Sequence, residues 1–91
     1  MKIGYARVCD RGQNLARQLE ALEAAGCEKI YTDKISGKNF DRPEYLKMIS
    51  SLTSDDVLII LSIDRLGRNY NEVTEEWRKI TKGIKADVKV L

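Results

Sequence analysis

The sequence predicts an α/β fold with three layers, in which helices cover both faces of a mainly parallel sheet of about four strands. Apolar segments typical of strands alternate with amphipathic segments typical of helices, in the order βαβαβαβ. Residues 57–61, Val-Leu-Ile-Ile-Leu, form a continuous apolar run, which is typical of a parallel strand buried on both faces. Together these features predict an open parallel sheet with right-handed crossovers.

The first half of the chain supplies two strands and two helices of this pattern. Residues 2–8 predict the first strand, and residues 28–32 predict a shorter second strand. Between them, residues 13–25 predict a helix with its apolar stripe at Leu15, Leu19 and Leu22, ended by Gly26. Residues 33–41 predict a mobile loop. Pro43 then opens a second helix with an expected apolar face of Leu46, Ile49 and Leu52.

The second half completes the pattern after the run at 57–61. Residues 62–69 predict a loop, and a third helix follows with Val73, Trp77 and Ile80 on its apolar side. This helix is acidic at its start and basic at its end, which suits the helix dipole, and we expect Gly83 to end it. Residues 87–91 predict the fourth strand.

Composition favours one cytoplasmic domain, because 91 residues can build one modest core and no segment looks like a signal peptide or a membrane span. The net charge of +2 is too small to indicate a nucleic-acid partner by itself. The chain has no histidine, which makes a metal site improbable and removes the commonest general base. Its two cysteines do not indicate a disulfide framework, and we expect Cys27 to be buried or half-buried.

Candidate functional residues gather at one edge of the predicted sheet. In an open parallel sheet, ligands bind outside the carboxyl ends of the strands. Several side chains are expected at that edge because they follow the first or third strand or flank the neighbouring helices: Arg7, Cys9, Gln13, Gln18, Arg42, Asp64, Arg65 and Arg68. Converging guanidinium groups suit a phosphate, and neither nucleotide-binding glycine motif is present. The arrangement therefore favours a phosphodiester attacked by a side-chain nucleophile.

Each of these residues also has a purely structural interpretation. Arg65 and Arg68 are compatible with a solvated loop, and Arg7 is compatible with a structural ion pair, for example with Asp64. Cys9 alone would more often be an inert buried thiol, and the glutamines alone indicate nothing. Only their expected convergence favours a functional site.

Three blocks of the sequence, in order, resemble the small serine recombinases of the resolvase and invertase type. The first resembles the start G-Y-A-R-V-S followed by Q-x-L and R-Q, and the last resembles the D-R-L-x-R signature. In this chain the blocks are residues 4–9 with 13–15 and 17–19, then 33–37 with 42–43, then 63–68. Spacing and order agree across nearly all 91 residues.

This resemblance implies a catalytic domain that cuts and rejoins DNA through a covalent 5′-phosphoryl link, without a metal or other cofactor. It places Cys9 at the nucleophile position. It implies that Arg7, Arg65 and Arg68 contact the scissile phosphate and that Arg42 is a further active-site arginine. It also implies that Asp64 positions or protonates groups at the leaving oxygen. Gln13 and Gln18 match supporting polar residues. The expected partner is double-stranded DNA, bound by a dimer or tetramer of the full-length protein.

The sequence departs from the family pattern in two ways. Cys9 stands where the family has serine, and Asp10 adds a negative charge where serine or threonine is commoner. A thiol beside arginines should ionise readily, but sulfur is a soft nucleophile for phosphorus. In addition, residues 1–91 read as the catalytic core alone, without the family's dimerisation helix and helix-turn-helix domain. We therefore expect this chain to be monomeric or weakly associating and to bind DNA weakly.

Two other functions remain open on the sequence. One is a regulatory or assembly domain that keeps the recombinase fold and has lost its chemistry, which Cys9 and Asp10 favour and the intact arginines disfavour. The other is a small phosphate-binding signalling domain of flavodoxin-like topology, which the absence of an acidic phosphoacceptor cluster disfavours.

Overall fold

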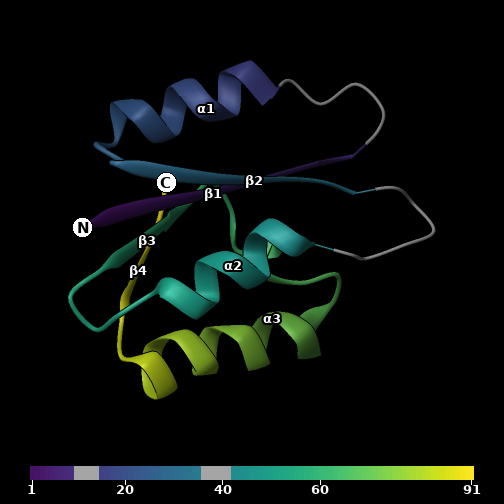
Figure 1. The fold of residues 1–91 in the computed structure, drawn as a ribbon. Helices are drawn as coiled ribbons and strands as arrows, with labels where there is room; N and C mark the ends of the chain where they lie inside the picture. The colour runs from purple at the N-terminus through teal and green to yellow at the C-terminus, as the bar shows by residue number, and fades with distance from the viewer. Residues whose placement is uncertain (10–14, 36–41) are drawn as a thin grey trace.

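Four parallel strands form one sheet, and helices cover both of its faces (Figure 1). The computed structural model describes residues 1–9, 15–35 and 42–91, apart from the side chains of residues 9 and 35. The strands are β1 (Lys2–Cys9), β2 (Lys29–Ile35), β3 (Val57–Ile60) and β4 (Asp87–Val90), in the spatial order β2-β1-β3-β4. The predicted α/β class is confirmed, with every strand pair parallel.

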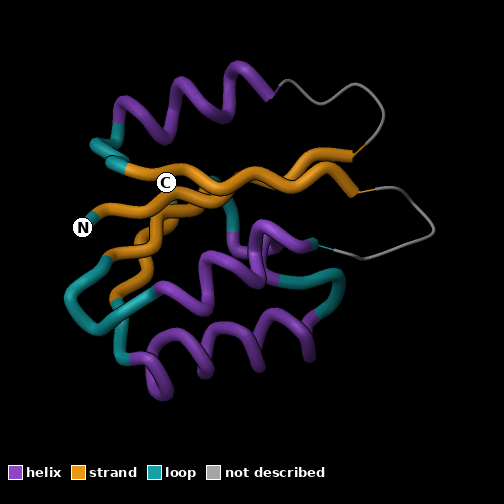
Figure 2. Tube along the Cα trace, viewed as in Figure 1, coloured by secondary structure: helices purple, strands orange, loops and turns teal. Residues whose placement is uncertain are grey.

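Helices lie on both faces of the sheet, as Figure 2 shows. The helical elements are α1 (Leu15–Ala24), α2 (Pro43–Ser51), the short 3-10 helix η1 (Ile63–Leu66), α3 (Tyr70–Arg78) and the π-helical turn η2 (Lys79–Ile84). Helix α1 covers one face, whereas α2 and α3 cover the other. The result is the predicted three-layer arrangement.

Alternation along β1 divides the core between these two faces. Ile3 and Tyr5 belong to the larger buried cluster, which includes Tyr45 of α2 and Ile80 at the end of the α3 segment. Ala6 points to the opposite face and packs in a smaller cluster beneath α1. Successive side chains of a strand point to opposite faces, so odd-numbered β1 residues face α2 and α3.

The central strand β3 is buried on both faces, as its apolar run predicted. Leu58, Ile59 and Ile60 are all fully buried. Leu58 and Ile60 join the cluster on the α2 and α3 side, while Ile59 joins the one on the α1 side. Cys27 is half-buried and packs against the α1 cluster, also as predicted.

The second strand is longer than the sequence suggested, and this changes the interpretation of Asp33. β2 continues to Ile35, so Asp33 lies in the strand and is only 4% exposed, whereas we predicted a mobile loop from residue 33. A carboxylate is a weak strand former, and its hydrogen bonds to other elements outweigh that local preference. Residues 36–41 of the predicted loop lie outside the described part of the chain.

The predicted apolar face of the second helix is wrong at Leu46. Leu46 is 59% exposed, whereas Tyr45 and Met48 are fully buried, together with Leu52 just beyond the helix. The buried positions therefore run at i, i+3 and i+7 from Tyr45. The expected burial of Leu52 is confirmed, and Ile49 is partly buried against the same cluster. Tyr45 carries the largest apolar surface of the helix, and its burial sets the rotation of α2.

The third helical segment ends later than predicted. The backbone continues past Gly83 to Ile84 in a wider π turn, and Lys85 after it adopts the left-handed conformation. Its N–H donates to the carbonyl of Ile80. In addition, the predicted loop at 62–69 contains η1, one turn of 3-10 helix. No helix in residues 1–9, 15–35 and 42–91 is long and apolar enough to cross a membrane.

The rotation of α2 gives a matched pair of substitutions. Met48→Ala should lower the free energy of unfolding by about 2–5 kcal/mol, because it opens a cavity in the fully buried cluster. Leu46→Ala, on the same helix, should change it by less than about 0.5 kcal/mol because Leu46 is exposed. Urea unfolding followed by circular dichroism measures both, and a larger loss for Leu46→Ala would contradict the observed orientation of α2.

Candidate active site

The candidate site lies at the carboxyl ends of β1 and β3. Arg7 is near the end of β1, and the chain leaves β3 into η1, which carries Asp64 and Arg65. The Arg7 Nη2 donates a hydrogen bond to the backbone carbonyl of Asp64 at 2.8 Å. Our structural interpretation paired Arg7 with the Asp64 carboxylate, whereas this hydrogen bond goes to the main chain. Arg7 therefore joins the two strand ends through backbone recognition.

Arg42 fixes the other end of the same short helix. It immediately precedes α2 and is 9% exposed. Its Nη1 donates to the carbonyl of Leu66 at 2.7 Å and lies 3.5 Å from that of Arg65. The guanidinium carbon stands 3.9 Å from the centre of the Tyr45 ring. Arg42 thus binds the last carbonyls of η1, which have no partner within the helix.

Arg65 is also largely enclosed, with its side chain 17% exposed. Its Nη1 lies 3.5 Å from the Asp64 carboxylate, and its buried Nε has no hydrogen-bond partner among the described residues. The Asp64 carboxylate accepts a short hydrogen bond from the Ser62 hydroxyl. A buried donor without a partner is costly, and an incoming anion would satisfy it.

The three enclosed arginines are close enough to repel one another. Burial lowers the pKa of the Arg7 guanidinium below its ordinary value, and the charges of Arg65 and Arg42 lower it further. Tyr5 and Asp64 act in the opposite direction. Like charges gathered in a partly buried place raise the energy of the unliganded state. A phosphate bound among them would relieve that repulsion.

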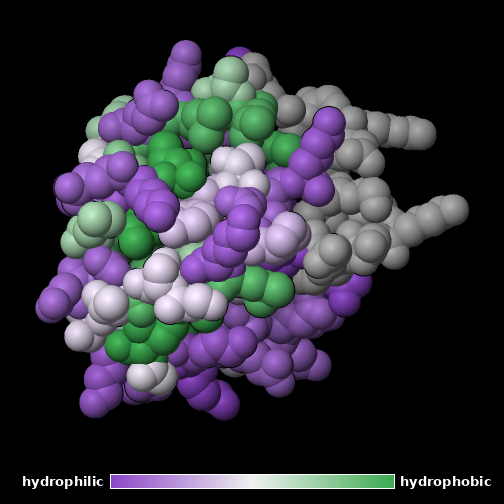
Figure 3. Space-filling model, in the orientation of Figure 1, coloured by the Kyte–Doolittle hydropathy of each residue, from purple (hydrophilic) through white to green (hydrophobic). Residues whose placement is uncertain are grey.

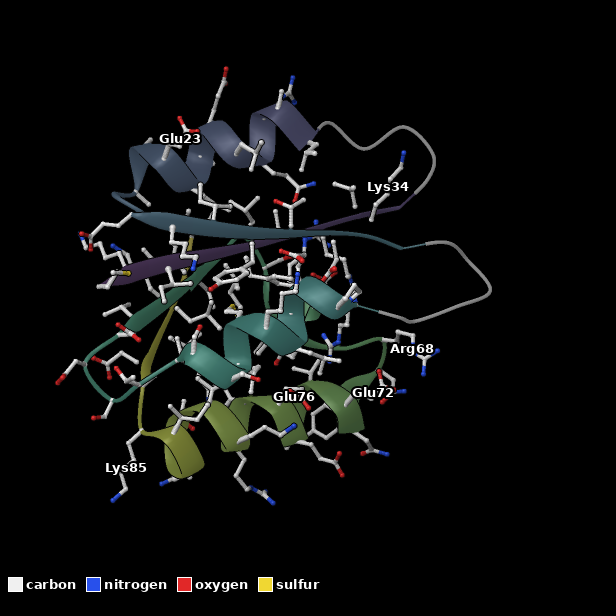
Figure 4. All side chains as sticks on the ribbon, viewed as in Figure 1. Glu23, Lys34, Arg68, Glu72, Glu76 and Lys85 are labelled. Carbon is white, nitrogen blue, oxygen red and sulfur yellow. The ribbon has the colours of Figure 1, made fainter. Side chains whose placement is uncertain are left out.

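Arg68 occupies a different environment from the other three. It follows η1, its side chain is 59% exposed, and it is bound to Glu72 at the start of α3. Figure 4 shows the two side chains next to each other at the edge of the molecule. The structure therefore holds Arg68 against a carboxylate rather than within the enclosed cluster.

A buried carboxylate, Asp33, supports the site and was missed by the sequence argument. Asp33 accepts a hydrogen bond from the Tyr5 hydroxyl at 2.8 Å. It also accepts from the backbone N–H groups of Glu44 and Tyr45, at 3.0 and 2.9 Å. These are among the first, unpaired N–H groups of α2, so Asp33 anchors the start of the helix that Arg42 precedes. An aspartate ending an apolar segment shortly before a helix-starting proline was the available signal.

Tyr5 and Tyr45 are buried phenols that donate to carboxylates. Burial and the hydrogen bond to Asp33 raise the pKa of Tyr5. Burial and a hydrogen bond of 2.6 Å to Glu76 raise the pKa of Tyr45. The two rings meet edge to face, with centroids 5.1 Å apart. Both hydroxyls therefore stay protonated near neutral pH and act as donors. Tyr5 thereby joins β1 to β2, and Tyr45 joins α2 to α3.

The remaining predicted residues are placed less completely. Cys9 is the last residue of β1 and pairs in register with Ile35, and its side chain lies outside the described atoms. Gln13 lies outside the described residues altogether. Gln18 is buried on α1, with its Oε1 lacking a hydrogen-bond partner among the described residues. Helix α1, which carries Gln18, covers the face of the sheet opposite α2 and α3.

An apolar groove of about 570 Å³ adjoins the site between η1 and α3. Its walls include Ile63, Val73 and Trp77, and Asp64 and Arg68 contribute its polar lining. We predicted Trp77 as core, and it is half-buried against the larger cluster while also facing this groove. By contrast, hydrophilic residues cover most of the visible surface around α3 in Figure 3. Among the described residues, no three potential ligands group together to hold a metal ion.

Parallel strands with arginines near their carboxyl ends define this α/β domain, and sequence comparisons identify its family. Residues 2–90 match the family described as Resolvase, N terminal domain. The chain is 49% identical over 73 residues to a DNA-invertase of Escherichia phage P1, covering 80% of this chain and 39% of that protein. It is 47% identical over 73 residues to the Transposon Tn552 resolvase of Staphylococcus aureus, covering 80% and 37%.

The chain belongs to the resolvase N-terminal domain family and is a serine recombinase catalytic domain homologous to invertases and resolvases. A third relative, the Serine recombinase gin of Escherichia phage Mu, is 45% identical over 73 residues, covering 80% of this chain and 38% of that protein. The chain spans about two fifths of the length of these curated relatives. This membership removes the signalling-domain alternative.

The buried carboxylate can be tested with two nearly isosteric substitutions. Asp33→Asn should lower the free energy of unfolding by about 1–3 kcal/mol, because its amide NH2 would face N–H and O–H donors. Tyr5→Phe should cost less, about 1 kcal/mol, since Asp33 keeps two backbone donors. Urea unfolding of both variants measures the difference, and an unchanged midpoint for Asp33→Asn would contradict the anchoring role.

Arg42 can be tested through the backbone that it binds. Arg42→Lys should destabilise the chain by about 1–3 kcal/mol, because a single ammonium cannot both stack on Tyr45 and bind the η1 carbonyls. The backbone amide resonances of residues 65–68 should shift in an NMR spectrum. Arg78→Lys, an exposed change on α3, serves as the control. Unmoved resonances at 65–68 would show that Arg42 does not hold η1.

Proposed function

We propose that this domain cuts and rejoins double-stranded DNA, with residue 9 as the nucleophile and the surrounding arginines as the phosphate site. The observation that carries the proposal is the enclosed cluster of Arg7, Arg42 and Arg65 at the end of β1. A bound anion would relieve the mutual repulsion of these arginines, and guanidinium groups suit phosphate oxygens. Cys9 ends the same strand two residues after Arg7.

The proposed step is a direct displacement at phosphorus. The nucleophile of residue 9 forms a bond to the scissile phosphorus and loses its proton, while the bond from phosphorus to the 3′ oxygen breaks and that oxygen takes up a proton. The DNA 5′ phosphate is then linked to the protein. The reverse attack by a 3′ hydroxyl reseals the strand, so the bond energy is conserved and no cofactor is required.

The other predicted residues have distinct roles in this proposal. Arg7 and Arg65 stabilise the charge that builds on the phosphate oxygens in the transition state, and Arg68 binds the same phosphate. Asp64 acts at the leaving oxygen. Arg42, whose guanidinium binds the carbonyls of η1, contributes by holding that turn in place. Gln13 and Gln18 remain predicted supporting residues.

Cys9 makes this chain a weaker nucleophile than a serine relative. A thiolate forms readily near arginines, but its sulfur attacks phosphorus poorly compared with an alkoxide oxygen. We infer that the domain works on DNA in the cytoplasm, as a dimer or tetramer of a longer protein. The runner-up function is a regulatory or assembly domain with impaired chemistry, and the Cys9 and Asp10 substitutions are the observation that favours it.

A chimaera tests the proposal directly. Residues 2–90 would replace the matching segment of the phage P1 DNA-invertase, and covalent protein–DNA adducts would be measured on a gel. Cys9→Ser in the chimaera should raise adduct formation at least about tenfold, the effect of about 1.4 kcal/mol on the barrier. Adding Arg68→Ala to that variant should abolish the adduct, whereas Arg78→Ala, an exposed arginine of α3, should leave it unchanged.

Two results would contradict the proposal in different ways. A Cys9→Ser chimaera that folds and binds DNA but forms no adduct would favour the impaired regulatory domain. An adduct that persists with Arg68→Ala would remove Arg68 from the phosphate site and leave the nucleophile assignment standing.

A further inference from the structure

Glu72 holds Arg68 through several hydrogen bonds. Its Oε1 accepts from the Arg68 backbone N–H at 2.8 Å and lies 3.4 Å from the Arg68 Nε. Its Oε2 accepts from the Arg68 Nη2 at 3.1 Å. The carboxylate therefore lies along the Nε and Nη2 edge of the guanidinium. That edge is one of those through which an arginine binds two oxygens of a carboxylate or phosphate.

The start of α3 fixes Glu72 in this position. Asn69 caps the helix, and its side chain accepts from the Glu72 N–H at 3.0 Å. Gly67 packs so closely on this turn that an added Cβ would lie 2.6 Å from the Glu72 Cβ and 2.8 Å from the Val73 nitrogen. The loop therefore approaches the helix only with glycine at this position. Glu72 is thus presented to Arg68 by a turn with little freedom.

The charge of Glu72 is maintained by the arginine that it holds. The hydrogen bonds from the Arg68 side chain and backbone lower the pKa of the Glu72 carboxyl below its ordinary value. Glu72 therefore remains ionised at neutral pH. A phosphodiester that approaches Arg68 meets an anion already bound there. Arg7 and Arg42 instead donate hydrogen bonds to backbone carbonyls.

We propose that Glu72 is an internal competitor of the DNA phosphate for Arg68, so that DNA binds this domain only by displacing the Glu72 carboxylate. The inference rests on the proposed role of Arg68 as a phosphate ligand. A phosphate also held by the enclosed arginines gains enough to take Arg68 from Glu72, whereas a phosphate that meets Arg68 alone does not. Glu72 is a positioning residue that acts through Arg68 and prevents it from binding the phosphates of nonspecific DNA.

Fluorescence anisotropy with a labelled DNA duplex at low salt tests this proposal on the 91-residue chain. Glu72→Gln should tighten binding about two- to fivefold, because the exposed ion pair that holds Arg68 contributes only a small free energy. The glutamine oxygen can still accept from the Arg68 N–H, so the helix start is retained, and an unchanged melting temperature would verify this. A purely structural role for Glu72 predicts the opposite, weaker binding.

Two further variants separate competition from a general change of charge. Glu75→Gln removes the same charge from an exposed position of the same helix and should alter binding much less. Glu72→Gln combined with Arg68→Ala should lose the gain, because the released arginine is then absent. Equal gains from Glu72→Gln and Glu75→Gln, or a gain that persists without Arg68, would overturn the proposal, as would absence of detectable binding by Glu72→Gln.

Failure of this proposal can be distinguished from failure of the proposed function by comparison with the chimaera experiment. If Arg68→Ala abolishes the covalent adduct there and Glu72→Gln does not tighten DNA binding, competition is refuted while the proposed function stands. If Arg68→Ala leaves the adduct unchanged, the phosphate role of Arg68 fails first.

Discussion

The hydrogen bonds accepted by the buried Asp33 carboxylate are the interaction on which the candidate site depends. They join three elements: β1 through the Tyr5 hydroxyl, β2 through the aspartate itself, and α2 through the N–H groups of Glu44 and Tyr45. A buried charge is tolerated only where donors surround it, and here all three donors are provided. Because Arg42 directly precedes α2, the carboxylate also determines where that arginine lies.

From Arg42 the dependence continues to the residues of η1. Arg42 binds the carbonyls at the end of this turn, and Arg7 binds the carbonyl of Asp64 within it. The turn is therefore held from the β1 side and from the α2 side. These main-chain contacts fix the backbone that carries Asp64 and Arg65, whose side chains also pair with each other. Such support allows groups of like charge to remain together.

The four arginines divide into an enclosed group and an exposed one, and this division has a physical consequence. Burial and the charges of Arg65 and Arg42 lower the pKa of Arg7, so this group of like charges favours an added anion. Arg68 already has an anion in Glu72. The enclosed group therefore provides attraction for phosphate, while the exposed pair resists it. In our proposal, binding of the phosphate to the enclosed arginines provides the free energy that separates Arg68 from Glu72. Arg68 therefore binds only a phosphate that is correctly placed among the enclosed arginines.

The sequence by itself determined the α/β class, the order of the elements, the family resemblance and the edge at which Arg7, Asp64 and Arg65 meet. These follow from local periodicity and from the rule that parallel strands present their carboxyl ends together. Local patterns could not predict which face of α2 is buried, since Leu46 and Tyr45 both fit an apolar stripe. Only the packing of Tyr45 against Tyr5 distinguishes them. For the same reason Asp33 looked like a loop residue until its distant donors were in place.

The tertiary structure alone decided which partner each arginine has. Arg42 and Arg7 bind backbone carbonyls, and a carbonyl carries no signature in a sequence. The burial of Gln18 on α1 was likewise decided by packing. The Arg68 and Glu72 pair is four residues apart and was readable in principle, but its meaning depends on the neighbouring phosphate site. Sequence fixes which groups are available, whereas burial and contact determine what each of them can bind.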